Sequence, residues 1–314
     1  MPDNHSGKNS SDNSTVLITG GNGLVGRYLT SALLSEGFRV SVLSRNAGLR
    51  GKVKVFSWNP EKKIIDPGLF KDVDYLIHLA GANIGEKRWT KKRKEEIVNS
   101  RSGSARFLYK VVNENKINLK AFITASATGY YGSVTSDKIF TEEDPSSEDF
   151  LGTTCRLWEE GADLFAKMGI RTVKIRTAVV LEKSDSALSK LMKPARFGIV
   201  LRLGNGKQYF PWIHIKDLCN IYLKAVEDQN MFGAYNAVAP EYINHNDFVR
   251  TMAGVMNKQV FLPPFPAWIL RRVMGEMSDV VLKGSRISAA KIINSGYSFR
   301  FDKLGDALKD VIMG

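Results

Sequence analysis

The sequence predicts an α/β protein in which helices cover both faces of a parallel sheet. Two observations carry this prediction. In the first, the segment from Thr15 to Asn46 reads as a short apolar run, a turn with three glycines, a helical pattern and a second apolar run. In the second, further apolar runs alternate with helical patterns as far as Leu181. Strands that alternate with helices pair in parallel, because each helix carries the chain back to the starting edge of the sheet.

The glycine turn lies between the first strand and the first helix. Gly20, Gly23 and Gly26 have the spacing of a dinucleotide-binding unit. In such a unit the glycines form a tight turn, let the backbone approach a pyrophosphate and pack the helix against the strand. The free N–H groups and the dipole at the helix N-terminus favour that anion. The sequence therefore predicts a Rossmann-like, doubly wound sheet with a nucleotide site, and Gly37 is expected to end the helix.

The end of the second strand indicates which nucleotide binds. An NAD-binding unit usually has Asp or Glu there, which hydrogen-bonds the 2′-hydroxyl of the ribose. This chain has Ser44 and Arg45 instead, with Arg50 close behind. A guanidinium and a hydroxyl suit a 2′-phosphate, whereas the alternative is a solvated arginine on a surface turn. We therefore predict that the cofactor is NADP(H).

Composition limits the class of protein. The 314 residues are 43% hydrophobic and 25% charged, as in an ordinary globular protein of one large domain or two modest ones. No apolar run reaches the length of a membrane span and no signal-peptide core is visible, so no membrane partner is expected. Cys155 and Cys219 are too few for a disulfide framework or a metal cluster, which indicates a cytoplasmic setting without a metal site. Residues 1–14 are polar and are predicted to be a disordered tail.

The net charge of +13 shows an excess of basic residues, which can attract anionic partners. The densest cluster is EKRWTKKRK, residues 86–94. It is consistent with the solvated start of a helix, with contact to an anionic substrate or a cofactor phosphate, or with nucleic-acid binding. No nucleic-acid-binding motif accompanies it, and Glu95 and Glu96 follow at once. We expect a small-molecule substrate and no nucleic-acid partner.

Four further strands are expected before residue 182. They cover residues 53–58, residues 74–80, a run from Ala121 into Ser126, and residues 171–181. Gly81 follows the second of these, so the backbone can come close to a ligand at the carboxyl edge of the sheet, where such folds bind ligands. His78 lies inside the same apolar run and is interpreted as a core histidine.

A long helix is expected from about Thr90 to Asn113, and Arg101 falls on its apolar stripe, four residues after Ile97. A charge on a buried face needs an anionic partner, because an unpaired charge there is costly. The partner is either a carboxylate, for example Glu96, or a phosphate of the cofactor.

Hydroxyl side chains follow the strand that runs into Ser126. Tyr130 and Tyr131 come directly after it, and side chains at the carboxyl end of a strand face the nucleotide crevice in this fold. The alternative for both tyrosines is packing in the core or in a lid. Thr153 and Thr154 are expected to cap the next helix, which Gly169 closes.

The pattern changes from about Glu182. Basic helical residues 187–197, a glycine loop, a helix capped by Asp217 and a break at prolines 263–266 follow in quick succession. We predict that residues 15–181 form the nucleotide-binding domain, which also receives segments around residues 212–238. Residues 182–314 would then form mainly a smaller α/β lobe that covers the crevice and selects a substrate.

Several motifs carry a resemblance to a known family. They are LITGGNGLVG at 17–26, LSR at 43–45, HLAGANI at 78–84, RW at 88–89 with SR at 100–101, SATGYYG at 126–132, FPWIHIKDL at 210–218 and NAVAP at 236–240. The chain resembles the extended, epimerase/dehydratase-like branch of the short-chain dehydrogenase/reductase superfamily, and more closely the atypical "epimerase family protein" group with its family-specific C-terminal region. The resemblance implies NADP(H) contacts at Gly20, Gly23, Leu24, Val25, Ser44, Arg45, Leu79, Ala80, Glu96, Arg101 and Val180.

The chain departs from that superfamily at its catalytic pair. Catalytic members use a Tyr and a Lys four residues later, and the Lys lowers the pKa of the Tyr so that the phenol can exchange a proton with an alcohol or carbonyl. None of the ten tyrosines here has a Lys four positions on. Alignment on the Glu that usually follows the pair puts Leu151 at the Tyr position and Cys155 at the Lys position, while Ser126 remains.

Two functions follow from these residues. The first is an NADP(H)-dependent oxidoreductase or epimerase that acts on a small carbonyl or sugar-nucleotide-like substrate. That substrate would be an anion if the basic cluster at residues 86–94 contacts it. Ser126 would orient the carbonyl and Tyr130 or Tyr131 would supply the proton. The second is a non-catalytic NADP(H)-binding redox sensor, which the missing Tyr/Lys pair favours.

Overall fold

The computed structural model describes residues 14–51, 53–184, 188–189, 192, 195 and 200–314. In this part of the chain a nine-stranded sheet has the order β13-β9-β7-β6-β1-β2-β4-β3, with β5 beside β4. Only β3 and β5 are antiparallel to their neighbour β4. The strands are β1 (Thr15–Thr19), β2 (Arg39–Ser44), β3 (Gly48–Arg50), β4 (Val53–Asn59), β5 (Ile64–Ile65), β6 (Tyr75–His78), β7 (Ala121–Ala127), β9 (Arg171–Thr177) and β13 (Gly233–Ala237).

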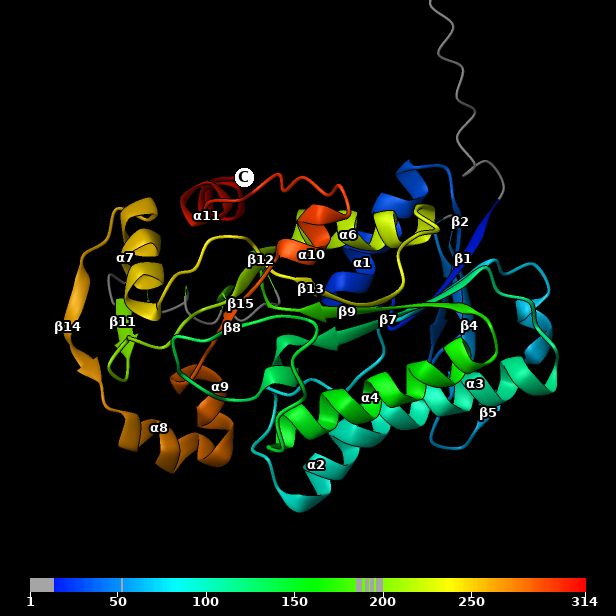
Figure 1. The fold of residues 1–314 in the computed structure, drawn as a ribbon, viewed down its shortest axis with the longest axis horizontal. Coiled ribbons are helices and arrows are strands. Elements are labelled where there is room, and N and C mark those ends of the chain that lie inside the picture. Colours follow the sequence, from blue (N-terminus) through cyan, green and yellow to red (C-terminus); the bar gives the residue numbers. More distant parts are fainter. Residues whose placement is uncertain (1–13, 52, 185–187, 190–191, 193–194, 196–199) are drawn as a thin grey trace, which may run out of the picture.

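Helices cover both faces of this sheet (Figure 1). One face carries α1 (Leu24–Ser35) and α6 (Ile215–Glu227), and the other carries α2 (Lys91–Val98), α3 (Ser104–Glu114) and α4 (Phe150–Lys167). Strand β1 is buried along its whole length, because Val16 and Ile18 face one core while Leu17 faces the other. The predicted doubly wound, Rossmann-like α/β fold is confirmed.

The expected helix from Thr90 to Asn113 is present, but it is interrupted. A π-helical turn, η2 (Asn99–Gly103), separates α2 from α3. Such turns are frequent at functional sites, because they change the direction of the side chains that follow. The turn contains Arg101.

Two helix starts differ from the prediction. Asp149, not Thr153 or Thr154, caps α4: its Oδ1 accepts a hydrogen bond of 2.8 Å from the N–H of Gly152. Helix α6 starts at Ile215, so Asp217 lies inside its first turn.

Asp217 is used elsewhere. It is buried and accepts hydrogen bonds from the Tyr297 hydroxyl (2.7 Å) and from the N–H groups of Arg300 and Phe301 (2.8 and 3.0 Å). The carboxylate therefore joins α6 to the C-terminal segment.

The second half of the chain builds small elements around one end of the sheet. The described two-stranded sheets are β10-β12, β11-β14 and β15-β8. The remaining elements are η1 (Pro67–Phe70), η3 (Thr128–Tyr131), β8 (Ile139–Phe140), β10 (Val179–Leu181), β11 (Val200–Leu203), β12 (Trp212–His214), α7 (His245–Val255), β14 (Val260–Phe265), α8 (Ala267–Met274), η4 (Gly275–Ser278), α9 (Asp279–Leu282), β15 (Arg286–Ile287), α10 (Ala290–Asn294) and α11 (Leu304–Met313).

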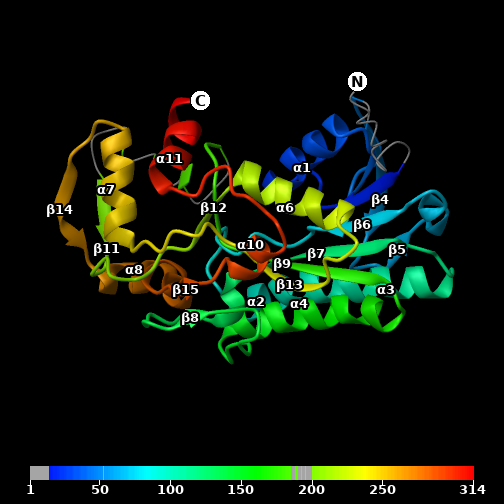
Figure 2. The same cartoon turned by 45° about the horizontal axis from the view of Figure 1, so that its top comes forward.

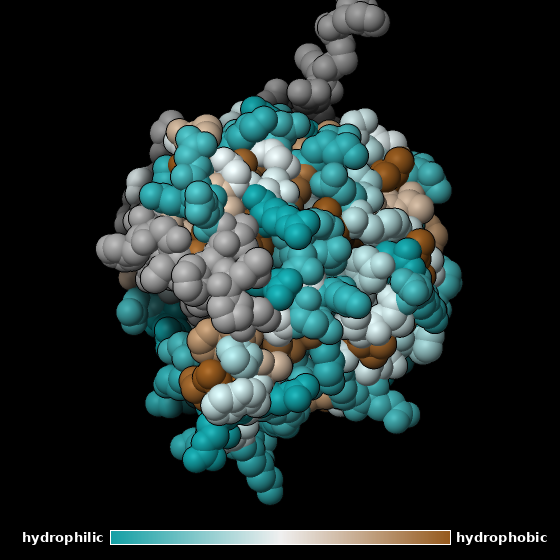
Figure 3. Space-filling model, turned by 90° about the vertical axis from the view of Figure 1, so that its left-hand side faces the viewer, coloured by the Kyte–Doolittle hydropathy of each residue, from teal (hydrophilic) through white to brown (hydrophobic). Residues whose placement is uncertain are grey.

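Elements α7, α8, α11, β11 and β14 gather at the end of the molecule opposite β4 and β5 (Figures 1 and 2). On this end hydrophobic side chains are scattered among hydrophilic ones on the face in view (Figure 3). Strand β13 joins the main sheet, as expected for a segment near residues 212–238, and the division into two domains stays a prediction.

Three parts of the predictions concern residues that the structure places differently or does not describe. The predicted tail lies outside the described residues except for Ser14, and so does most of the helix at 187–197. The predicted proline break holds a strand as far as Phe265, and α8 begins after Pro266. Among the described residues, every helix is too short or too polar to cross a membrane.

Buried histidines couple the stability of the fold to pH. Burial lowers the pKa of His78 and of His245 to about 4, whereas a histidine in an unfolded chain titrates near 6.5. The unfolded chain therefore binds the protons more tightly. Above about pH 6.5 the histidines are neutral in both states and the free energy of unfolding keeps its full value. It falls as the pH drops from about 6.5 toward 4, because the unfolded chain takes up the protons first.

The two histidines differ in their partners, which gives a test. Neither ring nitrogen of His245 has a partner in the described part of the chain, whereas His78 bonds to Thr19 and Ser104. His245→Leu should keep the free energy of unfolding at pH 7.5 and reduce its loss between pH 6.5 and 4 by roughly 3 kcal/mol. His78→Leu should lower it by about 1–3 kcal/mol at pH 7.5, because two buried partners lose their bonds. Urea unfolding at several pH values measures both, and an unchanged pH dependence in His245→Leu would contradict the assignment.

Candidate functional site

Two of the glycines after β1 are required by close contacts. Gly20 has φ +72°, and a Cβ there would lie 2.9 Å from the main-chain nitrogen of Ala80. A Cβ on Gly26 would lie 2.4 Å from the carbonyl oxygen of Gly20. The turn therefore packs against the strand end that holds Leu79 and Ala80, and α1 packs against the turn.

The N-terminus of α1 suits a pyrophosphate. The helix begins after Gly23, which is exposed and supplies no capping side chain. The N–H groups of the first helical turn, at Leu24, Val25 and Gly26, are thus left for a bound anion. The residues present fit the predicted dinucleotide.

The end of β2 also fits a 2′-phosphate. Ser44 Oγ accepts a hydrogen bond of 2.9 Å from the Asn22 side-chain amide, so its own proton remains available for donation. Arg45 is exposed and forms no ion pair with the described carboxylates. The side chain of Arg50 lies outside the described residues.

A chain of hydrogen bonds joins the end of β1 to the π-helical turn. Thr19 Oγ1 accepts from the N–H groups of Leu79 and Ala80, at 3.2 Å each, and so donates to His78 Nδ1 at 2.7 Å. His78 Nε2 then carries the proton and donates to Ser104 Oγ at 3.1 Å. His78 is a neutral core histidine, as expected.

Arg101 has different partners from the carboxylate that the sequence suggested. Its Nη1 donates to the Ile97 carbonyl (3.1 Å) and its Nη2 to the Ala82 carbonyl (2.9 Å). Glu96 instead pairs with Arg93 at 2.7 Å, because these two side chains lie one turn apart on α2 whereas Arg101 lies in the π-helical turn. Of the two alternatives for Arg101, the pair with Glu96 is therefore not formed, and the cofactor phosphate stays a prediction.

The surroundings of Arg101 place its charge at the edge of the sheet. Burial lowers the pKa of Arg101 to about 10, which leaves it charged at neutral pH. A Cβ on Gly81 would lie 3.0 Å from its Cζ, so Gly81 gives the guanidinium room. The guanidinium also lies over the ring of Trp158 of α4, with its Cζ 5.2 Å from the ring centre.

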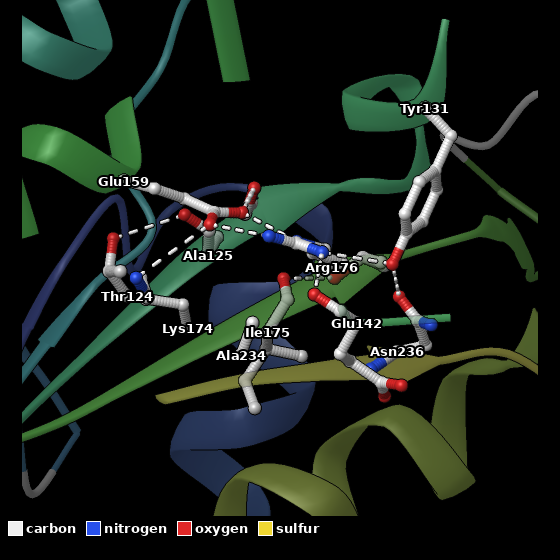
Figure 4. Close-up of polar contacts among 12 residues, drawn as sticks. Thr124, Ala125, Tyr131, Glu142, Glu159, Lys174, Ile175, Arg176, Ala234 and Asn236 are labelled. Atoms are coloured by element: carbon white, nitrogen blue, oxygen red, sulfur yellow. Dashed lines mark hydrogen bonds and ion pairs between the residues drawn. The ribbon is translucent and has the colours of Figure 1, made fainter. Parts of the chain in front are cut away.

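A buried ion pair lies beneath the candidate catalytic residues (Figure 4). Arg176 on β9 binds Glu159 on α4 through two hydrogen bonds, from Nε (2.8 Å) and Nη2 (2.9 Å). Only 3% of Arg176 and 4% of Glu159 is exposed. Ser126 Oγ donates to the same carboxylate at 2.7 Å. The Ser126 proton is thus directed into the protein.

Tyr131 belongs to the same network. Its hydroxyl donates to Asn236 Oδ1 on β13 (2.7 Å) and accepts from Arg176 Nη1 (2.9 Å), as Figure 4 shows. Burial raises the pKa of Tyr131 to about 12. The Asn236 N–H donates to Glu142 Oε1 (2.7 Å), and Arg176 Nη1 reaches the Glu142 carbonyl (3.3 Å).

Tyr130 is placed differently from Tyr131. It lies in η3 at the carboxyl end of β7 and is partly buried. The guanidinium of Arg176 stacks on its ring, 3.5 Å from the ring centre. Its hydroxyl forms no hydrogen bond with the described residues, so it is the phenol that remains for a ligand.

Apolar and neutral groups occupy the positions of the usual catalytic pair. A Cβ on Gly129 would lie 3.3 Å from Leu151 Cβ and 3.8 Å from Cys155 Sγ, so both side chains border η3. Burial raises the pKa of Cys155 to about 12, which keeps the thiol neutral. The usual proton relay is missing in the structure as well.

Sequence reasoning missed several of these residues. The sequence places Arg176 only within a predicted strand and Asn236 only within the NAVAP motif, and Glu159 serves only as a landmark for alignment. The available signal was a charged residue within the apolar run of residues 171–181, because such a residue must find a partner inside the protein. Val180, an expected cofactor contact, lies on β10 beside β12.

Comparisons with known proteins agree with this geometry. A family model described as "NAD dependent epimerase/dehydratase family" matches residues 16–156, and a "Domain of unknown function (DUF1731)" matches residues 265–311. Epimerase family protein YfhF of Bacillus subtilis is 35% identical over 300 residues, which cover 95% of this chain and 97% of that protein. Human epimerase family protein SDR39U1 is 30% identical over 302 residues, which cover 95% and 99%. The chain belongs to this epimerase family.

Solved structures extend the comparison. The human epimerase family protein SDR39U1, determined with NADPH, has a TM-score of 0.84 at 28% identity and covers 95% of this chain and 99% of its own. A nucleoside-diphosphate sugar epimerase of Corynebacterium glutamicum has a TM-score of 0.78 at 31% identity, over 96% of this chain and 59% of its own. UDP-glucuronic acid 4-epimerase of Bacillus cereus shares the fold at 20% identity with a TM-score of 0.76.

The buried ion pair gives this epimerase family protein a testable weak point. Glu159→Gln should lower the free energy of unfolding by about 3–5 kcal/mol, because it leaves the Arg176 charge buried without a counter-charge. The double variant Glu159→Gln with Arg176→Met should be more stable than Glu159→Gln alone. Denaturant unfolding of the wild type, Glu159→Gln, Arg176→Met and the double variant forms the cycle. Additive losses would show that the two side chains do not act as a pair.

Proposed function

We propose that this protein is an NADPH-dependent oxidoreductase, epimerase-like in fold, that reduces the carbonyl group of a small or sugar-nucleotide-like molecule. The cofactor assignment is supported by the glycine turn, by Ser44 and Arg45 in place of an acidic residue, and by the NADPH in the human relative. Cys155 and Cys219 are free, buried thiols, which suits the predicted reducing, cytoplasmic setting.

The observation that carries the proposal is the placement of Tyr130. Its hydroxyl is not engaged by the described residues, while those of Tyr131 and Ser126 are. Arg176 fixes the ring of Tyr130 by stacking on it. For Ser126 to hold a carbonyl oxygen, its proton would have to leave Glu159, so the proposal rests on Tyr130 as the donor.

The direction of the reaction follows from the missing lysine. NADPH, when bound, would supply a hydride to the carbonyl carbon. The Tyr130 phenol would give its proton to the carbonyl oxygen, so that an alcohol and NADP⁺ would result. The phenolate recovers a proton from water. A neutral phenol, which has a pKa near 10 in an unperturbed tyrosine, can donate without activation, whereas oxidation of an alcohol requires the phenolate first. Reduction is therefore the favoured direction.

A second candidate function is a non-catalytic NADPH-binding redox sensor. Leu151 and the neutral Cys155 at the positions of the catalytic pair favour it. The two candidates differ in one measurement. A sensor binds NADPH but oxidises it with no member of a panel of aldehydes, ketones and sugar nucleotides.

Cofactor preference tests the first part of the proposal. Arg45→Ala should weaken NADPH binding about ten- to a hundred-fold, because one charge-assisted contact to the 2′-phosphate is lost. NADH binding should stay within about twofold. Fluorescence titration of wild type and variant with both cofactors measures this, and equal affinity of the wild type for NADPH and NADH would overturn the assignment.

Turnover tests the second part. Tyr130→Phe should lower kcat at least about tenfold at saturating NADPH with the first carbonyl compound that is reduced, because the general acid is gone. Tyr131→Phe is the matched control. It should lower the melting temperature, since Asn236 and Arg176 lose a buried partner, and it should change kcat less. A larger kcat loss in Tyr131→Phe would reverse the assignment of the two tyrosines.

A further inference from the structure

The basic cluster at residues 86–94 is divided by the structure. Arg93 is buried and pairs with Glu86 (3.1 Å) and Glu96 (2.7 Å). Lys94 pairs with Glu276 of η4 at 2.5 Å. Glu86, Glu96 and Glu276 are thus already paired with other cations, and Arg88 has no ion pair with the described residues.

Arg88 is exposed, and its guanidinium lies beside Gly275. A Cβ on Gly275 would lie 2.8 Å from its Nε and 3.1 Å from its Nη2. Gly275 has φ +63°, and a side chain there would displace the guanidinium. Gly275 is the first residue of η4, so a segment from the second half of the chain lies beside Arg88, and none of its described carboxylates pairs with the guanidinium.

The neighbouring tryptophan fixes the loop beside the candidate proton donor. Trp89 donates from Nε1 to the Ile84 carbonyl (2.9 Å), and its ring lies 4.8 Å from that of Phe150. Phe150 starts α4, and the next residue, Leu151, borders η3 with Tyr130. Arg88 therefore lies on a loop that contacts the start of α4, and the start of α4 borders the turn of Tyr130.

We infer that Arg88 is a specificity-determining residue that binds an oxyanion of the substrate, a carboxylate or a phosphate. This inference rests on the proposed carbonyl reduction. A guanidinium presents two parallel N–H donors to such a group, and the net charge of +13 favours the approach of an anion. Lys87, Lys91 and Lys92 are exposed too, but their ammonium groups cannot give an oxyanion the two parallel N–H donors of a guanidinium.

Two matched pairs of compounds test the inference. 4-Carboxybenzaldehyde and benzaldehyde differ in a carboxylate, and glyceraldehyde 3-phosphate and glyceraldehyde differ in a phosphate. In the wild type kcat/KM should favour the charged member of at least one pair, and that pair identifies the oxyanion. Arg88→Gln should lower this preference about ten- to a hundred-fold, chiefly through KM, and leave the neutral member unchanged. Arg88→Lys should restore part of it.

Calorimetry with 4-carboxybenzyl alcohol and with glycerol 3-phosphate on the NADPH-loaded protein supplies a readout without turnover. Binding of one of them should weaken at least about tenfold in Arg88→Gln and stay unchanged in Lys87→Gln, while both variants bind NADPH like the wild type. Equal losses in the two variants, a parallel loss of NADPH affinity, or a lowered melting temperature alone would overturn the inference. If anion binding depends on Arg88 but the protein reduces no carbonyl compound, the anion site is retained and the proposed reductase function is refuted.

Discussion

The bidentate pair between Glu159 and Arg176 determines how the carboxyl end of the sheet is arranged. Removing two charges from water costs several kcal/mol for each ion, and only a complete set of hydrogen bonds offsets that cost. Here Ser126, Tyr131 and the Glu142 carbonyl complete the set. Since Tyr131 continues to Asn236, one network joins α4 to the three neighbouring strands β7, β9 and β13. The position of turn η3, and of Tyr130 within it, depends on this pair.

The same pair restricts the chemistry that the turn can perform. A lysine one helical turn from a tyrosine is a cation whose charge is available to the phenolate. Arg176 is also close to a tyrosine ring, but its charge is already balanced by Glu159. Leu151 and Cys155 place an apolar and a neutral group on the other side of η3. The arrangement orients a phenol without preparing a base, which suits proton donation.

What the sequence predicts well is what depends on residues close together in the chain. The apolar run of β1, the glycine spacing and the helix end at Gly37 depend on neighbours within a few positions, so their patterns are visible. The polar network is not visible in this way, because Ser126 and Glu159 are 33 residues apart and Tyr131 and Asn236 are 105 apart. Arg101 shows the same limit. The pattern indicates a buried charge on a helix, but it does not show the π-helical turn, in which the Arg101 guanidinium donates to carbonyl groups.

The order of the strands assigns different ends of a bound cofactor to different side chains. Along the carboxyl edge of the sheet, β2, β1, β6 and β7 are successive neighbours. Arg45 follows β2, the glycine turn follows β1, Gly81 beside Arg101 follows β6, and Tyr130 follows β7. Three strand spacings span about 14 Å, so the residue suited to a 2′-phosphate and the proposed proton donor are separated by a dinucleotide-sized stretch of sheet edge. Arg101 lies between them. Its hydrogen-bond partners among the described residues are carbonyl groups, so a ligand that carries negative charge would be favourable beside it.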